Sequence, residues 1–442
     1  MKRTTIYFLI SFLAGMITYF LPLGISQQAH LVLSILVTVG LLWLTEAMPI
    51  HITSLLIPLL LVLFADFSVK DVFVPFFDPV IVLLMGGFAM AYGLQKYKLD
   101  ELIAYFFIHN IGTSPKRFLF AIMIATAFLS MWMSNSATSA VMMPILTVIL
   151  VDSGLKKFES TYAKAAVLGV AFAATIGGLS TIVGTTPNAM AVKFLADSNV
   201  SISFLDWMYH TLPFTSIFLV LAWFVLTIIY KPDIEKLKVR RYFHRLSEEQ
   251  KRVLMVFGIT VLLWLTAGIH KISISLIALV PIFLFYILKL FDTKDFGHFH
   301  WDILILVGGG LSLGAAISFS GLNVVMANVL ELLVGGHHMI LTLFLTALFC
   351  ILMTVFSSNT GTAAFMIPTI FPLATSLGID ARIMVILAGV SVSLDFLVPI
   401  GTPPNAIAYS TGYIHIKDMI KAGIVLAILG ALLLSFLAWV YW

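Results

Sequence analysis

An apolar stretch with a polar interruption near its middle places the tightest limit on how this chain can fold. Phe118–Val151 contains 34 residues without one charged side chain, and Met133–Ala140 (Met-Ser-Asn-Ser-Ala-Thr-Ser-Ala) lies close to its centre. A membrane-spanning helix needs about 20 residues, whereas each arm of this stretch has roughly 16. Two arms that are each too short to cross predict a re-entrant hairpin with its polar tip at mid-depth. Irregular backbone persists there only where protein covers it or where it lines a wet cavity.

The same arrangement recurs later in the chain. Ser357–Ala363 (Ser-Ser-Asn-Thr-Gly-Thr-Ala) divides a second apolar run, Ile340–Ser376. A Gly-Gly pair precedes each tip, and a Gly-Thr-x-Pro-Asn-Ala sequence follows it. The matching pairs, at offsets of 222, 224 and 217 residues, are Leu84–Gly87 with Leu306–Gly309, Ser134–Asn135 with Ser358–Asn359, and Gly184–Ala189 with Gly401–Ala406. Three pairs in the same order predict a duplicated unit.

The composition is typical of a polytopic membrane protein. Hydrophobic residues make up 61% of the chain and charged residues 10%, whereas soluble chains carry about 25% charged residues. Phe8–Leu23 lacks a convincing signal-cleavage site and is interpreted as a first membrane helix. Cys350 is the only cysteine, which excludes an intrachain disulfide and a cysteine metal site, and the net charge of +4 does not indicate a nucleic-acid partner.

The apolar segments predict an all-α polytopic membrane protein with about eleven transmembrane helices and two re-entrant helical hairpins. The predicted spans are about 6–22, 30–48, 52–65, 79–95, 165–183, 207–230, 253–268, 273–290, 303–320, 383–400 and 419–441. The fifth and tenth spans break at Gly184 and Gly401, and a short half-helix follows the first break. Five spans per repeat place the second copy upside down, which makes an inverted repeat.

This count divides the chain into four parts. They are an extra N-terminal helix in 1–29, a first repeat in 30–230 with its hairpin at 117–151, a cytoplasmic linker in 231–252, and a second repeat in 253–442 with its hairpin at 340–376. With the N-terminus inside, 21 of the 25 Lys and Arg residues lie in inner segments. The outer ones are Lys70, Lys193, Lys271 and Arg382. Such a bias predicts a cell-membrane protein with a cytoplasmic N-terminus and an outer C-terminus.

Both tips and both breaks are expected to meet near the midplane of the membrane. Half-helix N-termini carry partial positive charge and free N–H groups, so they favour anions. Freed carbonyls, together with Asn and Ser oxygens, are ligands suited to sodium. No Lys or Arg lies in 118–150, 165–192, 340–381 or 383–412. A bound dianion would therefore rely on helix dipoles and co-bound cations, which is a physical reason to couple an anion to several cations.

Other interpretations apply to some of these residues. A single Ser-Asn pair often serves only to join membrane helices, although duplicated pairs at duplicated breaks favour a site. Glu46 is interpreted as an ion-paired or helix-end charge, and the Gly-Gly pairs as points of close helix packing. Asp395 lies six residues before the second break, and a carboxylate inside the membrane is a functional candidate. Its repeat counterpart is Gly178, so it is open whether Asp395 is a spectator, supports the second cation or carries protons.

At these residues the chain resembles the divalent anion:sodium symporter family, whose members carry Krebs-cycle dicarboxylates and related anions. The resemblance covers nearly the whole chain. It rests on the two hairpin tips, on both breaks, and on an early Thr-Glu-Ala-Met-Pro stretch at Thr45–Pro49. Two positions depart from the family pattern, because Ser136 stands in place of threonine and Thr186 in place of proline.

The resemblance implies a transporter, not an enzyme, that works as a homodimeric elevator. A unit made of the hairpins and spans 5, 6, 10 and 11 would slide against a fixed scaffold. It implies substrate contacts from Ser134, Asn135, Ser136, Thr185, Ser358, Asn359, Thr360 and Thr402. It also implies one sodium among Ser130, Ser134, Asn135 and Gly184, and a second among Thr354, Ser358, Asn359 and Gly401.

The expected function is sodium-coupled uptake of C4-dicarboxylates such as succinate, malate and fumarate. The expected partners are these anions, sodium ions, the lipid bilayer and a second copy of the chain, with no cofactor beyond the coupling ions. Three alternatives stay open. They are a dicarboxylate exchanger of the same fold that does not use sodium, a sulfate-type inorganic anion carrier, and an intramembrane hydrolase. The hydrolase needs a nucleophile–base pair or two facing aspartates, and neither hairpin contains a histidine.

Overall fold

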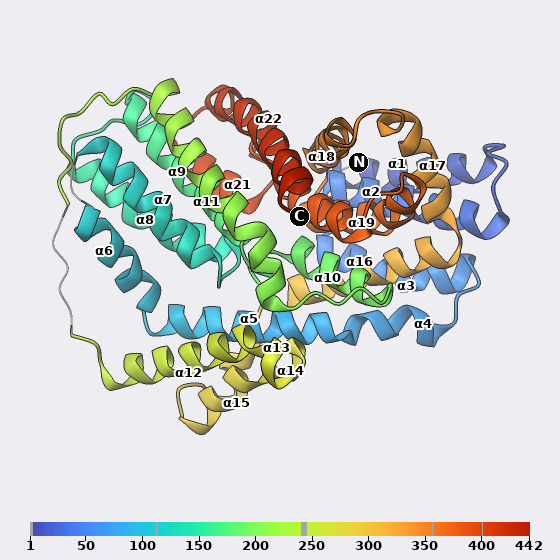
Figure 1. Cartoon of the computed structure of the whole chain (residues 1–442), viewed down its shortest axis with the longest axis horizontal. Coiled ribbons are helices and arrows are strands. Elements are labelled where there is room, and N and C mark those ends of the chain that lie inside the picture. Colours follow the sequence, from blue (N-terminus) through green and yellow to red (C-terminus); the bar gives the residue numbers. More distant parts are fainter. Residues whose placement is uncertain (1–2, 112–113, 240–244, 356, 400) are drawn as a thin grey trace.

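The structure, a computed structural model, describes residues 3–111, 114–239, 245–355, 357–399 and 401–442 (Figure 1). Within these ranges the regular elements are α-helices and two short 3-10 helices, so the predicted all-α class is confirmed. Seven helices of the described residues are long and apolar enough to cross a membrane, or eight if α17 and α18, bent by 119°, form one span. The prediction of eleven crossings and two re-entrant hairpins stays a prediction.

The helices follow the repeated order that the motifs predict. The first part of the chain forms α1 (Arg3–Phe20), α2 (Gln27–Thr45), α3 (Ile50–Phe64), α4 (Val69–Phe73), η1 (Val74–Phe77), α5 (Pro79–Lys96), α6 (Leu99–Ile111), α7 (Pro115–Ser130), α8 (Asn135–Asp152), α9 (Thr161–Gly178), α10 (Thr186–Asp197) and α11 (Phe204–Ile229). The second part forms α12 (Glu248–Leu265), α13 (Ala267–His270), α14 (Ile274–Ile277), α15 (Leu279–Ile287), η2 (Asp295–His298), α16 (Trp301–Phe319), α17 (Leu322–Val334), α18 (Met339–Val355), α19 (Asn359–Ser376), α20 (Ala381–Ser391), α21 (Pro403–Ser410) and α22 (Ile416–Val440).

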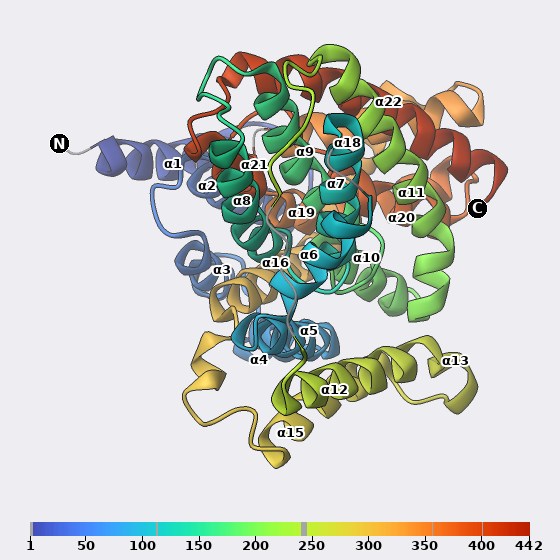
Figure 2. The same ribbon diagram turned by 90° about the vertical axis from the view of Figure 1, so that its left-hand side faces the viewer.

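One group of helices is built on two close glycine contacts, one from each Gly-Gly pair. Helix α16 packs against α3, and α5 packs against α14 and α15. A Cβ on Gly309 would lie 2.6 Å from the Cβ of Ser54, and one on Gly86 would lie 2.2 Å from the carbonyl oxygen of Ala278. Only glycine permits backbones to approach so closely. The predicted packing role of the Gly-Gly pairs is therefore confirmed, and Figure 2 shows α5, α12 and α15 together on one side of the molecule.

The second group contains the two hairpins and the two broken helices. Helix α9 packs against both arms of the first hairpin, α7 and α8, and α20 packs against both arms of the second, α18 and α19. The half-helix after each break packs on the other half of the chain: α10 contacts α19 and α20, and α21 contacts α8 and α9. This exchange of half-helices brings both breaks and both tips to one place.

Two helices were missed by the sequence interpretation. Helices α6 and α17 lie where connecting loops were expected, between the Gly-Gly helix and the hairpin of each half. Leu99 and Leu322 begin them, a separation of 223 residues that matches the other repeat offsets. They were missed because each has only 13 residues and carries polar side chains, so neither fits the pattern of a span.

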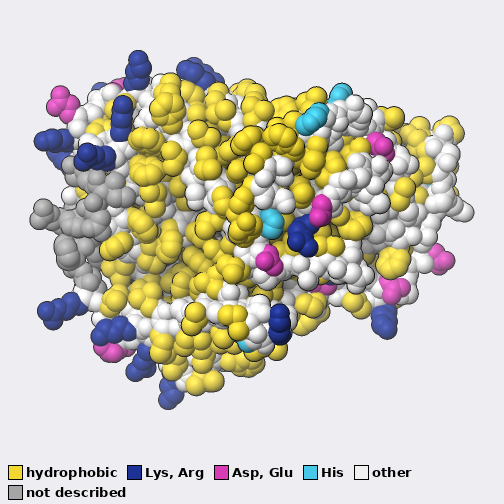
Figure 3. Space-filling view, in the orientation of Figure 1, with side chains coloured by type: hydrophobic (Ala, Val, Ile, Leu, Met, Phe, Trp, Pro, Cys, Tyr) yellow, Lys and Arg dark blue, Asp and Glu magenta, His cyan; other side chains and the backbone are white. Residues whose placement is uncertain are grey.

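Some predicted boundaries also need correction. Helix α2 was expected to continue to Met48, but it ends at Thr45, because Glu46 adopts the left-handed conformation with φ 46°. Helix α12 begins at Glu248, inside the predicted linker, where Ser247 and Gln250 form a capping box. Figure 3 shows Lys and Arg side chains gathered mainly at the left-hand end of this face, with hydrophobic side chains over its middle. This distribution agrees with the charge bias seen in the sequence.

Candidate functional site

The hairpin tips and the helix breaks enclose one cavity of about 160 Å³. All eight residues predicted to contact substrate line it: Ser134, Asn135, Ser136, Thr185, Ser358, Asn359, Thr360 and Thr402. The predicted cation residues Gly184 and Gly401 line it as well. Apolar side chains from α3, α5 and α16 close the opposite wall: Ile50, Leu84, Phe88, Ile303 and Leu306. The structure therefore brings together residues that lie up to about 350 positions apart in the sequence.

Four helices begin at this cavity, and each begins with a Ser or Thr cap. The hydroxyl of Ser134 accepts a hydrogen bond from the backbone N–H of Ala137, and that of Ser358 accepts one from Gly361. Thr185 and Thr402 are the N-cap residues of the half-helices α10 and α21, and of these two the Thr402 hydroxyl accepts a hydrogen bond, from the backbone N–H of Asn405, whereas Thr185 makes no side-chain cap bond. Because the N-terminus of a helix carries about half a positive charge, the four ends give the cavity a positive potential. None of the residues that line it is Lys, Arg, Asp or Glu.

The two hairpins position their asparagines in the same way. The Ser130 hydroxyl lies 2.8 Å from Asn135 Oδ1 and 2.6 Å from the carbonyl oxygen of Ala174, and the Thr354 hydroxyl donates to Asn359 Oδ1 over 2.8 Å. In each pair the hydroxyl residue lies in the last turn of the first hairpin helix, α7 or α18. The asparagine is the first residue of the second hairpin helix, α8 or α19. Ser130 and Thr354 are both fully buried, so they lie behind the asparagines and not on the cavity surface.

Two further asparagines donate hydrogen bonds to backbone carbonyls at the helix breaks, and they were not among the predicted site residues. The side-chain amide of Asn188 donates to the carbonyl oxygens of Gly178 and Thr181, over 3.1 and 2.7 Å. That of Asn405 donates to the carbonyl oxygens of Asp395 and Val398, over 3.2 and 3.1 Å. These bonds satisfy carbonyls that a broken helix leaves unpaired. The repeated Pro-Asn pair was the sequence signal that could have identified them.

Thr186 is a third site residue that the sequence did not indicate. It lines the cavity, and its hydroxyl is hydrogen-bonded to the hydroxyl of Thr360 on the second hairpin. Its counterpart in the other break is Pro403, which has no hydroxyl. The departure from the family pattern at this position therefore adds a polar contact between the halves.

Asp395 lies directly behind the second break and not on the cavity surface. Its side chain is fully buried, and its Oδ1 accepts a hydrogen bond from the backbone N–H of Leu397 over 3.2 Å. Its Oδ2 has no hydrogen-bond partner among the described residues. A Cβ built on Gly401 would lie 1.5 Å from that oxygen, so the carboxylate reaches across the break.

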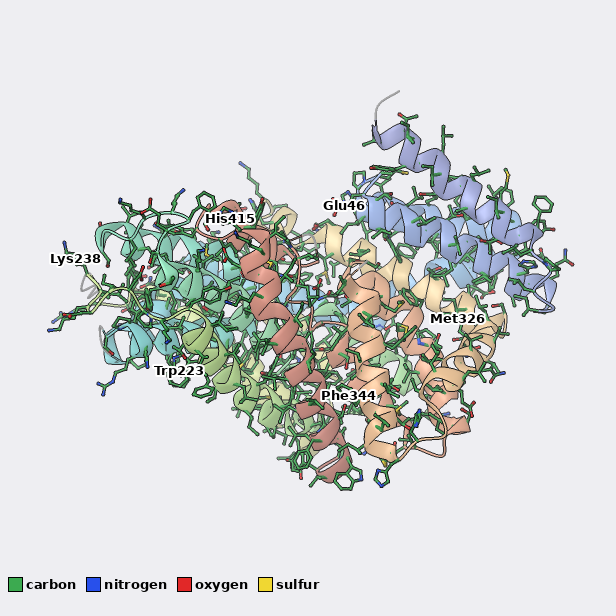
Figure 4. The ribbon with its side chains drawn as sticks, turned by 90° about the horizontal axis from the view of Figure 1, so that it is seen from above. Glu46, Trp223, Lys238, Met326, Phe344 and His415 are labelled. Atoms are coloured by element: carbon green, nitrogen blue, oxygen red, sulfur yellow. The ribbon has the colours of Figure 1, made fainter. Side chains whose placement is uncertain are left out.

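The cavity continues toward one side of the molecule. A larger cavity of about 650 Å³ shares Ser358, Gly401 and Thr402 with it and extends to Glu46 and Tyr409. Glu46 is exposed at the end of α2, as Figure 4 shows, which fits the predicted helix-end charge. On the other side, a cavity of about 820 Å³ contains the ion pair between Lys193 and Asp78 but shares no lining residue with the site.

Comparison with known proteins gives consistent matches over nearly the whole chain. Residues 2–442 match the family described as the sodium:sulfate symporter transmembrane region. An uncharacterised transporter of Haemophilus influenzae is 33% identical over 98% of this chain and 97% of its own. The sodium-dependent dicarboxylate transporter SdcS of Staphylococcus saprophyticus is 31% identical over 91% of this chain and 84% of its own.

A solved structure supports the fold alone. The YdaH transporter of Alcanivorax borkumensis, a protein with an unusual topology, superposes with a TM-score of 0.58 over 84% of this chain and 86% of its own. The sequence identity is 13%, so this likeness concerns the helical architecture and not the chemistry of the site.

Proposed function

The chain belongs to the sodium:sulfate symporter family, and from this premise we propose that it couples the entry of sodium ions to the uptake of C4-dicarboxylates. Members of this family are transporters and not enzymes. Relatives of about 30% identity are named sodium-dependent dicarboxylate transporters, which supports this substrate class. The several long apolar helices make the protein a multi-pass membrane protein.

The observation that carries the proposal is the convergence of four helix N-termini on a cavity without a charged lining residue. Such ends offer backbone N–H donors and a favourable potential to an anion. They do not neutralise a dianion, because a helix dipole carries no net charge and the bound anion would leave two uncompensated negative charges in the protein. Sodium ions bound next to the anion supply the missing charge, and this requirement couples the two solutes.

The shape of the cavity favours a dicarboxylate over sulfate. The polar groups come from two hairpin tips, each with its own Ser-Asn pair, so one carboxylate is expected at each tip. Leu84, Phe88, Ile303 and Leu306 then contact the carbon chain between them. Sulfate has no apolar part to bury against these four side chains. The volume of about 160 Å³ also suits a small anion.

The cation ligands are proposed from the paired oxygens behind the tips. Asn135 Oδ1 and the backbone oxygen of Gly184 both lie within about 3.1 Å of the position that a Cβ on Gly178 would occupy. Neutral oxygens grouped in this way suit sodium better than a transition metal. No cluster of three or more His, Cys, Asp or Glu occurs among the described residues, so these oxygens are the candidates.

Movement of one helix group against the other would carry the site across the membrane. The group with the hairpins meets the group with the Gly-Gly helices along α16–α19 and α5–α10. In the orientation that the charge bias predicts, the end of α2 faces the cytoplasm, and the 650 Å³ cavity then supports an inward-facing state. We propose an elevator motion in a homodimer, as in the family that the sequence resembles.

Uptake by the purified protein in proteoliposomes tests this function. We expect labelled succinate to accumulate when sodium is higher outside, and not when choline replaces sodium. Excess malate or fumarate should compete, and sulfate should not. Accumulation that needs only internal dicarboxylate, with or without sodium, would instead establish the exchanger. Uptake of sulfate that succinate does not inhibit would establish the inorganic anion carrier.

A further inference from the structure

The two cation sites implied by the proposed function differ in charge at one position. Their frameworks match: Ser130–Asn135 corresponds to Thr354–Asn359, and the amide contacts of Asn188 correspond to those of Asn405. The exception is the residue six positions before each break glycine, which is Gly178 in the first half and Asp395 in the second.

The first break has no room for a side chain at this position. A Cβ on Gly178 would lie 2.1 Å from Asn135 Oδ1, far inside van der Waals contact. A Cβ on Gly184 would lie 2.4 Å from the carbonyl oxygen of Gly178. Gly178 is therefore required for Asn135 to approach the break, and every ligand oxygen available there is neutral.

The second break holds a carboxylate in the corresponding place. Asp395 is fully buried, and its Oδ2, unpaired among the described residues, lies where a side chain on Gly401 would be. No Lys or Arg occurs in 383–412 or in the second hairpin, 340–376. A buried carboxylate without a partner is strongly disfavoured. The surrounding residues thus leave one oxygen unsatisfied and provide no positive charge for it.

We propose that Asp395 binds the second cation directly through Oδ2 and thereby makes substrate binding conditional on that cation. This inference rests on the proposed sodium coupling. Sodium prefers oxygen ligands, and a carboxylate is the strongest of them for a hard cation. When the cation is absent, the negative charge behind Gly401 repels a dianion in the cavity, because two like charges interact strongly where water is excluded. When the cation is bound, that repulsion is cancelled.

The two sites then have different roles. The second site, with its carboxylate, fills at lower sodium concentration and fills before the substrate enters. The first site, which has only neutral ligands, gains its strongest attraction from the bound dianion itself. The order of binding is therefore sodium, dicarboxylate and sodium again, and the order is set by a single difference between the halves.

The test is the sodium dependence of the melting temperature of the purified full chain without substrate, with choline replacing sodium at constant ionic strength. A ligand that binds the folded protein raises its melting temperature. Asp395→Asn should raise about tenfold the sodium concentration needed for a given increase in melting temperature, which corresponds to about 1.4 kcal/mol. Asp395→Gly, which copies the first break, should do the same and guards against poor folding of the amide variant.

Asp418→Asn is the matched control, because Asp418 is also a buried carboxylate but pairs with Lys164 at 3.2 Å, between α9 and α22. It should lower the melting temperature without changing the sodium concentration needed for a given increase. An unchanged sodium requirement in both Asp395 variants would overturn the direct-ligand proposal and leave sodium coupling intact. A wild-type protein that sodium and choline stabilise equally would overturn the proposed sodium coupling together with this inference.

Discussion

The two helix breaks of this protein have similar contacts but differ in charge. Each is capped by a threonine, held open by an asparagine amide and approached by the asparagine of one hairpin. The first break is built with Gly178 and is neutral. The second places the Asp395 carboxylate against Gly401. A duplicated fold can thus make two unequal ion sites by changing one residue, because the duplicated contacts keep the rest in place.

The largest loss of uptake is expected from substitutions of the two hairpin asparagines, which occupy equivalent places in the two halves. Asn135→Ala and Asn359→Ala each remove an oxygen proposed to serve a cation and an amide next to the anion. Each unsatisfied partner costs about 1–3 kcal/mol, so sodium-driven uptake should fall by about a hundredfold or more in both. The measurement is sodium-driven uptake by variants whose folding has been checked by size-exclusion chromatography. Wild-type uptake with unchanged sodium dependence in either variant would exclude the two-site arrangement.

A smaller loss of uptake is expected from alanine substitutions of two break glycines, and the rescue of that loss should differ between the halves. Gly401→Ala places a methyl group 1.5 Å from Asp395 Oδ2, and Gly178→Ala places one 2.1 Å from Asn135 Oδ1. Both should lower uptake by about tenfold or more, since neither neighbour can move without losing a contact. Adding Asp395→Gly should restore uptake to Gly401→Ala, with weaker apparent sodium affinity. Adding it to Gly178→Ala should restore nothing, and equal rescue of both would show that the methyl groups act elsewhere.

A substitution of Thr186, which differs from its counterpart Pro403 in the second break, is expected to have a weaker effect. Thr186→Pro makes the first break like the second and removes the hydroxyl bonded to Thr360. Proline is tolerated at the first position of a helix, and one hydrogen bond contributes about 0.5–1.5 kcal/mol. We expect succinate affinity to fall a few-fold with an unchanged sodium midpoint, measured by calorimetry. A sodium midpoint that moves as far as in the Asp395 variants would contradict this assignment.

The smallest effect concerns the ion pair that joins the two helix groups. Lys193 on α10 lies 3.3 Å from Asp78, the N-cap of α5. The corresponding residues of the second half are Ser410 and His300, without this pair. The pair lines a polar cavity, where solvent weakens the attraction between the two charges. Lys193→Met should therefore change the uptake rate by no more than about threefold. Sodium and succinate affinities should stay as in wild type. A large loss of affinity would place Lys193 in the substrate pathway.

Much of this arrangement could be predicted from the sequence, because the motifs lie at nearly constant offsets. The Ser134–Asn135 and Ser358–Asn359 tips and both Thr-x-Pro-Asn breaks carried enough signal to predict the residues of one cavity. The short helices α6 and α17 carried too little, since 13 residues with polar side chains fit neither a span nor a loop. Their equal spacing was visible only once their positions were known.

The direction of the Asp395 side chain could not be predicted, because its counterpart Gly178 has none. Symmetry argued against a place in the site, whereas the backbone turn before Gly401 carries the carboxylate across the break. The partner of Thr186 could not be predicted for a different reason. Its contact with Thr360 depends on which half-helix packs on which hairpin, and helix packing of this kind is a tertiary property that no local pattern records.

The most direct test of the central claim is the affinity of the purified protein for succinate as sodium is replaced by choline at constant ionic strength. A dianion held by helix ends without a cationic side chain needs co-bound sodium, so the dissociation constant should rise steeply as sodium falls. In Asp395→Gly, where the repelling charge is absent, the rise should be shallower. A succinate affinity that is independent of sodium in the wild-type protein would contradict the account.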